Sequence, residues 1–168
     1  AMVRAGLFVP GTGEGVFGAD YDGPCVPFFA AILADVGDSQ SIVESLSTFT
    51  ARMTRTAAAM KAAVETPPAL VLLDEVGAGT DPSEGTALAI ALLRNLADCA
   101  RLTIATTHFG ELKALKYSDS RFENASVAFD SDSLSPTYQL LWGIPGRSNA
   151  LAIATRLGFD SQVIEQAR

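Results

Sequence analysis

Residues 70–85 read LVLLDEVGAGTDPSEG, and this stretch decides the fold. A short apolar run leads directly into two adjacent carboxylates, Asp74 and Glu75, and a glycine-rich turn follows them. Because the residues before the carboxylates are all apolar, we expect a buried strand of a parallel sheet that delivers both carboxylates to its carboxyl edge. Adjacent residues of a strand point to opposite faces, which would give the two carboxylates separate tasks.

This pattern is typical of the Walker B motif of nucleotide hydrolases, in which one carboxylate belongs to the magnesium shell and the next one serves the attacking water. We assign Asp74 to the first task and Glu75 to the second. The alternative is an acidic strand end that only caps the next helix. The Gly-x-Gly-Thr-Asp-Pro turn favours catalysis, although no Gly-x-x-x-x-Gly-Lys-Ser/Thr phosphate loop occurs in the 168 residues.

The composition fits one globular unit, since 48% hydrophobic residues suffice for a sizeable core. The 19 acidic and 12 basic residues give a net charge of -7 without a basic cluster, so we expect any DNA contact to come from another part of a longer protein. Cys25 and Cys99 lack zinc or redox spacing and are expected to be reduced packing residues. No apolar run is long enough for a membrane helix and no secretory pattern opens the chain. We therefore expect no membrane partner and a cytoplasmic protein, or a plastid one if its source is a plant.

Apolar spacing predicts alternating strands and helices. A strand is expected within 28–36, and a long amphipathic helix over 42–64 that ends at Pro67-Pro68. After the strand at 70–75, Ser83 or Asp81 caps a helix, and 102–106 forms a second buried strand. The apolar positions expected for that helix are Ala87, Ile90, Leu93 and Leu96. This alternation implies parallel crossovers in an α/β sheet.

The two ends of the chain have weaker patterns. Residues 2–9 suggest the end of a buried helix, and 10–27 an irregular loop. Short strands at 127–129 and 138–142 suggest a hairpin or a sheet edge. Two helices, broken at Gly158, are expected at 148–157 and 160–168. The first of these packs either on a partner subunit or in the core of the same chain.

Two further features are candidates for phosphate contacts. His108, the only histidine, directly follows the strand at 102–106, so we expect it at the same sheet edge as Glu75, where an imidazole can hydrogen-bond a γ-phosphate. A surface histidine that caps the next helix is the alternative. Ser47 and Thr48 near the start of the long helix offer hydroxyls and backbone amides to an anion. On their own they are more often an ordinary helix cap.

Taken together, these motifs resemble the ATPase domain of MutS proteins, which belong to the ABC-type ATPases. The matching segments, in order, are LSTF at 46–49 followed by a helix with Arg52 and Met53, the Walker B stretch at 70–85, and ATTHF at 105–109. A finer resemblance points to the second MutS branch, which is associated with a C-terminal Smr nuclease domain. It is carried by ADVGDSQSIVESLSTF at 34–49 and GIPGRSNALAIATRLGF at 143–159. The resemblance runs from about residue 5 to residue 168.

The resemblance implies a role for each matching position. Asp74 resembles the Walker B aspartate associated with Mg²⁺, Glu75 the catalytic glutamate and His108 the switch histidine. Ser47, with Thr48, resembles the signature motif that reaches across a homodimer to the γ-phosphate of the ATP held by the other subunit. Gly77, Gly79, Thr80 and Asp81 resemble the loop after Walker B, which couples the two ATP sites of the dimer.

The expected fold is a partial P-loop NTPase-like α/β domain, mainly a parallel sheet flanked by helices, with C-terminal helices. We expect an ATPase domain without the Walker A loop at 1–147 and a C-terminal helical segment of the same domain at 148–168. The family's phosphate loop should precede the helix ending near Val9, so we expect the chain to begin after it. A sheet without that strand would expose apolar surface and self-associate.

The whole protein is expected to be a dimeric, ATP- and Mg²⁺-dependent DNA-binding protein of repair or recombination control, or of ribosome-associated quality control. DNA, and the ribosome if it is a partner, would be bound by other domains. The alternative is a non-hydrolysing dimerisation and regulatory module. The joint presence of Glu75 and His108 favours the ATPase. Without a phosphate loop, the 168 residues alone are expected to bind ATP very weakly and to hydrolyse it negligibly.

Overall fold

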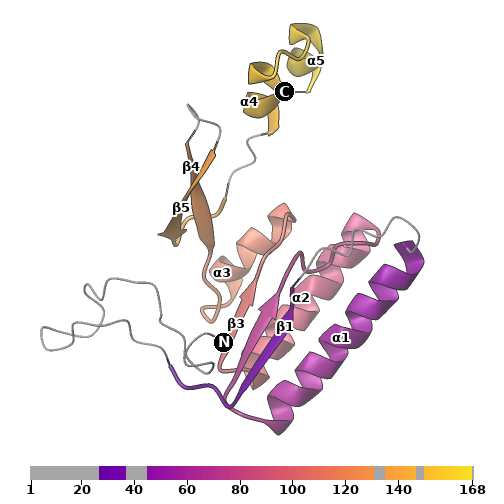
Figure 1. The fold of residues 1–168 in the computed structure, drawn as a ribbon, viewed down its shortest axis with the longest axis vertical. Helices are drawn as coiled ribbons and strands as arrows, with labels where there is room; N and C mark the ends of the chain where they lie inside the picture. The colour runs from indigo at the N-terminus through magenta and orange to yellow at the C-terminus, as the bar shows by residue number, and fades with distance from the viewer. Residues whose placement is uncertain (1–26, 37–44, 131–134, 147–149, 168) are drawn as a thin grey trace, which may run out of the picture. The chain divides into compact units, whose positions relative to one another are not determined.

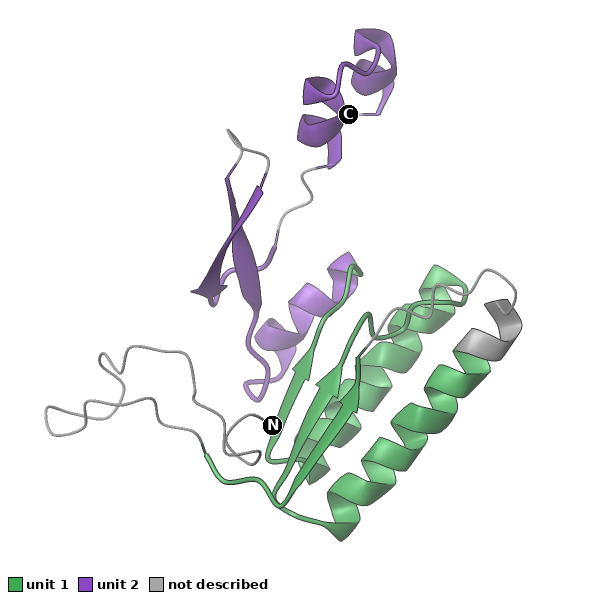
Figure 2. Ribbon diagram, viewed as in Figure 1, with its two compact units in different colours: residues 1–109 green, residues 110–168 purple. Residues whose placement is uncertain are grey.

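A computed structural model of the chain describes residues 27–36, 45–130, 135–146 and 150–167 (Figure 1). The side chains of 45–48 are not among the described parts. The helix end predicted at 2–9, Cys25 and all but the last residue of the loop predicted at 10–27 lie outside these ranges. The chain forms two compact units, 1–109 and 110–168 (Figure 2), and each is described by itself.

The first unit contains a three-stranded parallel sheet in the order β1-β2-β3. Its strands are β1 (Ala31–Asp35), β2 (Ala69–Leu73) and β3 (Leu102–Ala105). Val71 of the central strand pairs with Leu33 on one side and with Thr103 on the other. The predicted parallel arrangement, with the Walker B strand beside the strand that precedes His108, is confirmed.

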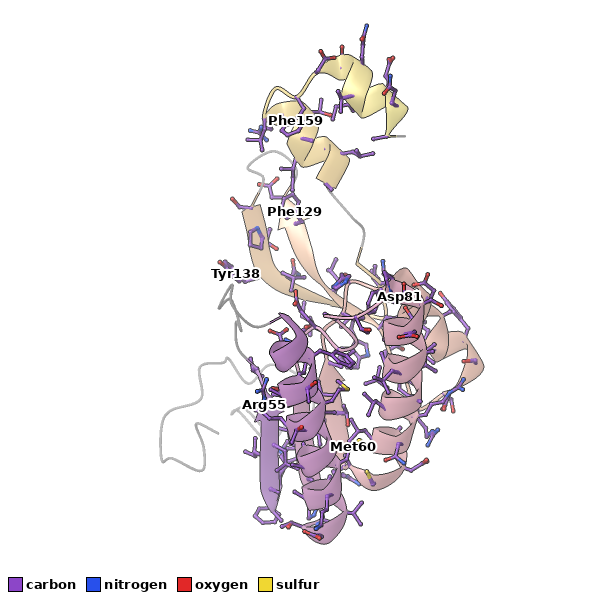
Figure 3. The ribbon with its side chains drawn as sticks, turned by 90° about the vertical axis from the view of Figure 1, so that its right-hand side faces the viewer. Arg55, Met60, Asp81, Phe129, Tyr138 and Phe159 are labelled. Atoms are coloured by element: carbon purple, nitrogen blue, oxygen red, sulfur yellow. The ribbon has the colours of Figure 1, made fainter. Side chains whose placement is uncertain are left out.

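Two helices cover one face of this sheet and lie side by side (Figures 1 and 3). They are α1 (Ser45–Glu65) and α2 (Pro82–Cys99). Leu96 of α2 and Val71 of β2 are fully buried between the layers and form the centre of the core. The Asp81 carboxylate accepts hydrogen bonds from the backbone amides of Ser83 and Glu84, at 2.9 and 3.2 Å. Of the two predicted caps, Asp81 is therefore the N-cap, with Pro82 as the first helical residue.

The buried stripe of α2 differs from the predicted one at its N-terminal end. Leu93 and Leu96 are buried as predicted, but Ala87 is exposed and Ile90 is half-buried. The inner positions of the first two turns are instead Gly85 and Ala89. The apolar spacing did not predict these positions, because glycine gives no hydrophobic signal. The helix approaches the preceding turn closely at Gly85.

The prediction that residues 102–106 form a buried strand was wrong for one face of that strand. Leu102 is 43% and Ile104 53% exposed, whereas Thr103 and Ala105 are half-buried. The reason is that β3 is the edge strand of the described sheet and only one of its faces lies under α2. Self-association through such a surface stays a prediction.

The second unit begins with a 3-10 turn at Gly110–Ala114 and the short helix α3 (Leu115–Ser118). It continues with the antiparallel pair β4 (Ala125–Asp130) and β5 (Ser135–Trp142), which confirms the predicted hairpin with longer strands. The helices α4 (Ala150–Arg156) and α5 (Ser161–Gln166) follow. Between them Gly158 has φ +81°, so the predicted break is confirmed.

One lysine ties α3 to the end of the hairpin. Lys116 Nζ donates to the Gly143 carbonyl at 2.8 Å and to the Glu123 carboxylate at 2.9 Å. The hydrogen bond with Glu123 is the main cause that raises the pKa of Lys116, and the same bond lowers the pKa of Glu123. Among the described helices, none is long and apolar enough to cross a membrane.

We predict that Leu96→Ala lowers the free energy of unfolding by about 3 kcal/mol, because it leaves a cavity where the two layers meet. Val64→Ala is the control: Val64 is 63% exposed on α1, and its truncation should change stability by less than about 0.5 kcal/mol. Urea denaturation followed by circular dichroism measures both variants. Equal transition midpoints for the two would contradict the placement of Leu96.

Candidate functional site

The chain turns sharply where β2 ends. β2 stops at Leu73, and the backbone amide of Asp74 donates to the Asp35 carbonyl at 3.0 Å. Glu75 then has φ +48°, a left-handed conformation that is uncommon for residues other than glycine. Asp74 is half-buried and Glu75 is exposed. The two carboxylates thus lie in a turn after β2. Their different directions come from this turn and not from the alternation of side chains along a strand that the sequence suggested.

Thr106 holds this turn against the end of β3. Its backbone amide donates to the Leu73 carbonyl at 3.0 Å, and its carbonyl accepts from the Val76 amide at 2.9 Å. Its hydroxyl Oγ1 accepts from the Glu75 amide at 2.9 Å and donates to Asp74 Oδ1. Sequence reasoning missed Thr106. The signal that could have found it is a hydroxyl residue that directly follows the strand beside Walker B.

The glycine-rich turn fits into a narrow space between α2 and Phe109. Gly77 has φ +85°, and a Cβ added there would lie 2.6 Å from the Gly85 carbonyl oxygen and 2.9 Å from Phe109 Cε2. Gly79 has φ +95°. Gly77 therefore needs to be glycine for two reasons, its backbone conformation and the lack of room for a side chain. Thr80, the residue before the Asp81 cap, is half-buried.

His108 lies at the same edge of the sheet. Thr107 Oγ1 accepts from the Phe109 amide at 3.1 Å, and Phe109 is buried. The His108 ring is exposed and lies 4.5 Å from the Phe109 ring, centroid to centroid. The segment that carries His108 is thus anchored by Thr106 on one side and Phe109 on the other, next to the turn that carries Glu75.

The start of α1 also lies against this turn. Ser47 and Thr48 belong to its first turn. Phe49 follows them, and its Cδ2 would lie 3.7 Å from a Cβ added at Gly79. Arg52 Nη1 donates to the Glu75 carbonyl at 3.1 Å. The structure therefore brings the helix that carries Ser47 and Thr48 to the turn that carries both carboxylates.

A second arginine of α1 holds the neighbouring strand end. Arg55 Nε forms an ion pair with Asp35 Oδ1 at 2.8 Å, and the Asp35 side chain is only 12% exposed. Figure 3 labels Arg55 on α1 and Asp81 at the start of α2. Arg52, with Met53, is among the residues that carry the resemblance to MutS proteins, but the sequence did not indicate its contact with the turn. Arg55 was not singled out, because a basic residue on the polar face of a helix has no distinct signal.

The carboxylates are suited to a hard cation that is shared with phosphate. In the described ranges no group of three or more His, Cys, Asp or Glu side chains could hold a metal ion by itself. Magnesium does not need such a group, because it is commonly bound through one or two carboxylates together with substrate phosphates and water. Asp74, the residue that follows the last residue of β2, could supply one such carboxylate.

A parallel sheet, a glycine-rich turn between its central strand and a helix, and carboxylates at the carboxyl edge define a P-loop NTPase-like α/β domain. The family described as MutS domain V matches residues 5–168, and the chain belongs to this family. The predicted fold class is confirmed.

Relatives of high identity cover nearly the whole chain. It is 56% identical to the endonuclease MutS2 of Synechocystis sp., over 99% of the chain and 21% of that protein. It is 51% identical to the endonuclease MutS2 of Caldicellulosiruptor saccharolyticus, over 99% of the chain and 20% of that protein. It is 47% identical to the endonuclease MutS2 of Symbiobacterium thermophilum, over 100% of the chain and 21% of that protein. The chain spans about a fifth of the length of these relatives. They confirm the predicted second branch, MutS2.

We predict that Gly77→Ala lowers the melting temperature by about 5 °C or more, because it adds a left-handed alanine and a clash with the Gly85 carbonyl. Gly110→Ala is the matched control, since a Cβ added at Gly110 meets nothing within 4 Å. Differential scanning calorimetry of both variants measures the effect. A Gly77→Ala protein as stable as the control would show that the turn is not packed as described.

Proposed function

We propose that the chain carries the carboxylate half of a MutS-type ATP-hydrolysing site. The observation that carries this proposal is the meeting of Asp74, Glu75 and the segment of His108 at one edge of the sheet. Membership of the MutS family supports it. The segments 70–85 and 105–109, which carry these residues, resemble the Walker B and switch motifs of that family.

Each residue takes a role that suits its position. Mg²⁺, when bound with ATP, would neutralise the charge on the β- and γ-phosphates. Asp74 would hold it through a carboxylate oxygen, directly or through water. Glu75, exposed at the turn, would orient the attacking water and accept its proton. His108 would hydrogen-bond the γ-phosphate and help to place that water.

The start of α1 would complete the site of a second subunit. In this proposal Ser47 and Thr48 reach the γ-phosphate of ATP held by the partner of a homodimer. The contacts from Phe49 and Arg52 of α1 to the turn support a coupling between the two sites. The coupling would run through the turn residues Gly77, Gly79, Thr80 and Asp81.

For the whole protein we propose an ATP-driven switch that controls DNA engagement by other domains, in repair or recombination, or ribosome engagement in quality control. The relatives are named endonucleases, and we place the nuclease activity in another domain. The net charge of -7 without a basic cluster supports DNA binding elsewhere. A non-hydrolysing dimerisation and regulatory module is the second candidate, which the joint presence of Glu75 and His108 disfavours.

We predict that Glu75→Gln, in the protein expressed from its complete gene, lowers kcat for ATP hydrolysis by about 100-fold or more, because the water loses its base. Binding of ATP should persist, since the amide keeps the shape of the side chain. Glu84→Gln is the control, an exposed carboxylate in the first turn of α2. Phosphate release under saturating ATP measures turnover. Equal rates for the two variants would reject the catalytic role and favour the regulatory module.

We predict that the 168 residues alone do not bind ATP with micromolar affinity, because they contain no Gly-x-x-x-x-Gly-Lys-Ser/Thr motif to cradle the phosphates. Isothermal titration calorimetry with Mg²⁺ and ATP tests this, with the protein from the complete gene as the positive control. Micromolar binding by the 168 residues would contradict the prediction.

A further inference from the structure

One hydroxyl group contacts both residues of the carboxylate pair. Thr106 Oγ1 accepts from the Glu75 amide at 2.9 Å and donates to Asp74 Oδ1. A threonine hydroxyl has one hydrogen to donate and lone pairs to accept with, so both bonds form at the same time. Among the described residues, no other side chain forms hydrogen bonds to both Asp74 and Glu75.

The geometry points to Thr106 as a positioning residue for ATP hydrolysis, whose hydroxyl orients the Asp74 carboxylate and holds the strained Glu75 backbone. This inference rests on the proposed function. A bond to one carboxylate oxygen fixes the rotation of the group, and with it the direction in which Asp74 presents its other oxygen. The bond from the Glu75 amide stabilises a backbone at φ +48° that is costly for a glutamate.

The hydroxyl is well placed for this role because the Thr106 backbone is itself held. Its amide bonds to the Leu73 carbonyl just before the pair, and its carbonyl bonds to the Val76 amide just after it. Removal of the hydroxyl leaves these backbone bonds in place. Since Thr106 is exposed, water can bond to the Glu75 amide when the hydroxyl is removed, so the loss of stability should be small. Its loss should therefore change the orientation of the pair more than the fold.

The test replaces Thr106 by valine, which has the same shape without the hydroxyl, in the protein expressed from its complete gene. We expect kcat to fall by about 10- to 100-fold, with the melting temperature only slightly lowered. Titration of Mn²⁺ in the presence of ATP, followed by electron paramagnetic resonance, should show an affinity lower by about tenfold. Thr106→Ser keeps the hydroxyl, so its kcat and its Mn²⁺ affinity should lie within about threefold of the wild-type values.

Thr103→Val is the matched control on the same strand. Its Oγ1 is buried and has no hydrogen-bond partner among the described residues, so its removal should alter neither turnover nor Mn²⁺ affinity. A Thr106→Val protein that behaves like this control would overturn the inference, and so would a Thr106→Ser protein as impaired as Thr106→Val. If Thr106→Val does not fold, Thr106→Ala is measured in the same way. Unfolding of both would show that the hydroxyl maintains the fold, which also overturns the inference.

Glu75→Gln separates this inference from the proposed function. If Glu75→Gln retains full turnover, the proposed catalysis fails. If Glu75→Gln abolishes turnover and Thr106→Val does not reduce it, only the role of Thr106 fails.

Discussion

Backbone hydrogen bonding between β2 and β3 continues past the last residues of both strands, and the positions of Asp74, Glu75 and His108 depend on it. Thr106 bonds through its backbone to the residues on either side of Asp74 and Glu75. These two hydrogen bonds hold the end of β2 next to the end of β3. The two segments with catalytic residue types therefore share one edge of the sheet.

The glycine-rich turn converts this edge into a site with a defined shape. Gly77 lies against Gly85 in the first turn of α2, and the Asp81 carboxylate caps that helix. Phe109 packs against the other side of Gly77. The turn is thus held by the helix that follows it and by the segment that carries His108, and a shift in one would be felt by the other.

Contacts from α1 give the same turn a third neighbour. Arg52 donates to the backbone carbonyl of Glu75, so this contact holds the main chain of the turn. Arg55 contacts the end of β1 through a side chain instead, because it forms an ion pair with the Asp35 carboxylate. The helix that carries the signature-like residues is therefore joined to the ends of two strands. In the proposed site, a movement of α1 would reach Glu75 through these contacts.

The sequence by itself determined the order of strands and helices, the family and the residue types at the sheet edge, because these depend on local apolar spacing and on contiguous motifs. It could not reveal the exposed face of β3, which depends on which face of the sheet the helices cover. It also did not reveal the role of Thr106, the contact of Arg52 with the turn, or the contact between Gly77 and Gly85. Those are contacts between segments far apart in the chain, and only the tertiary structure decided which hydroxyl, guanidinium or glycine of many would meet the turn.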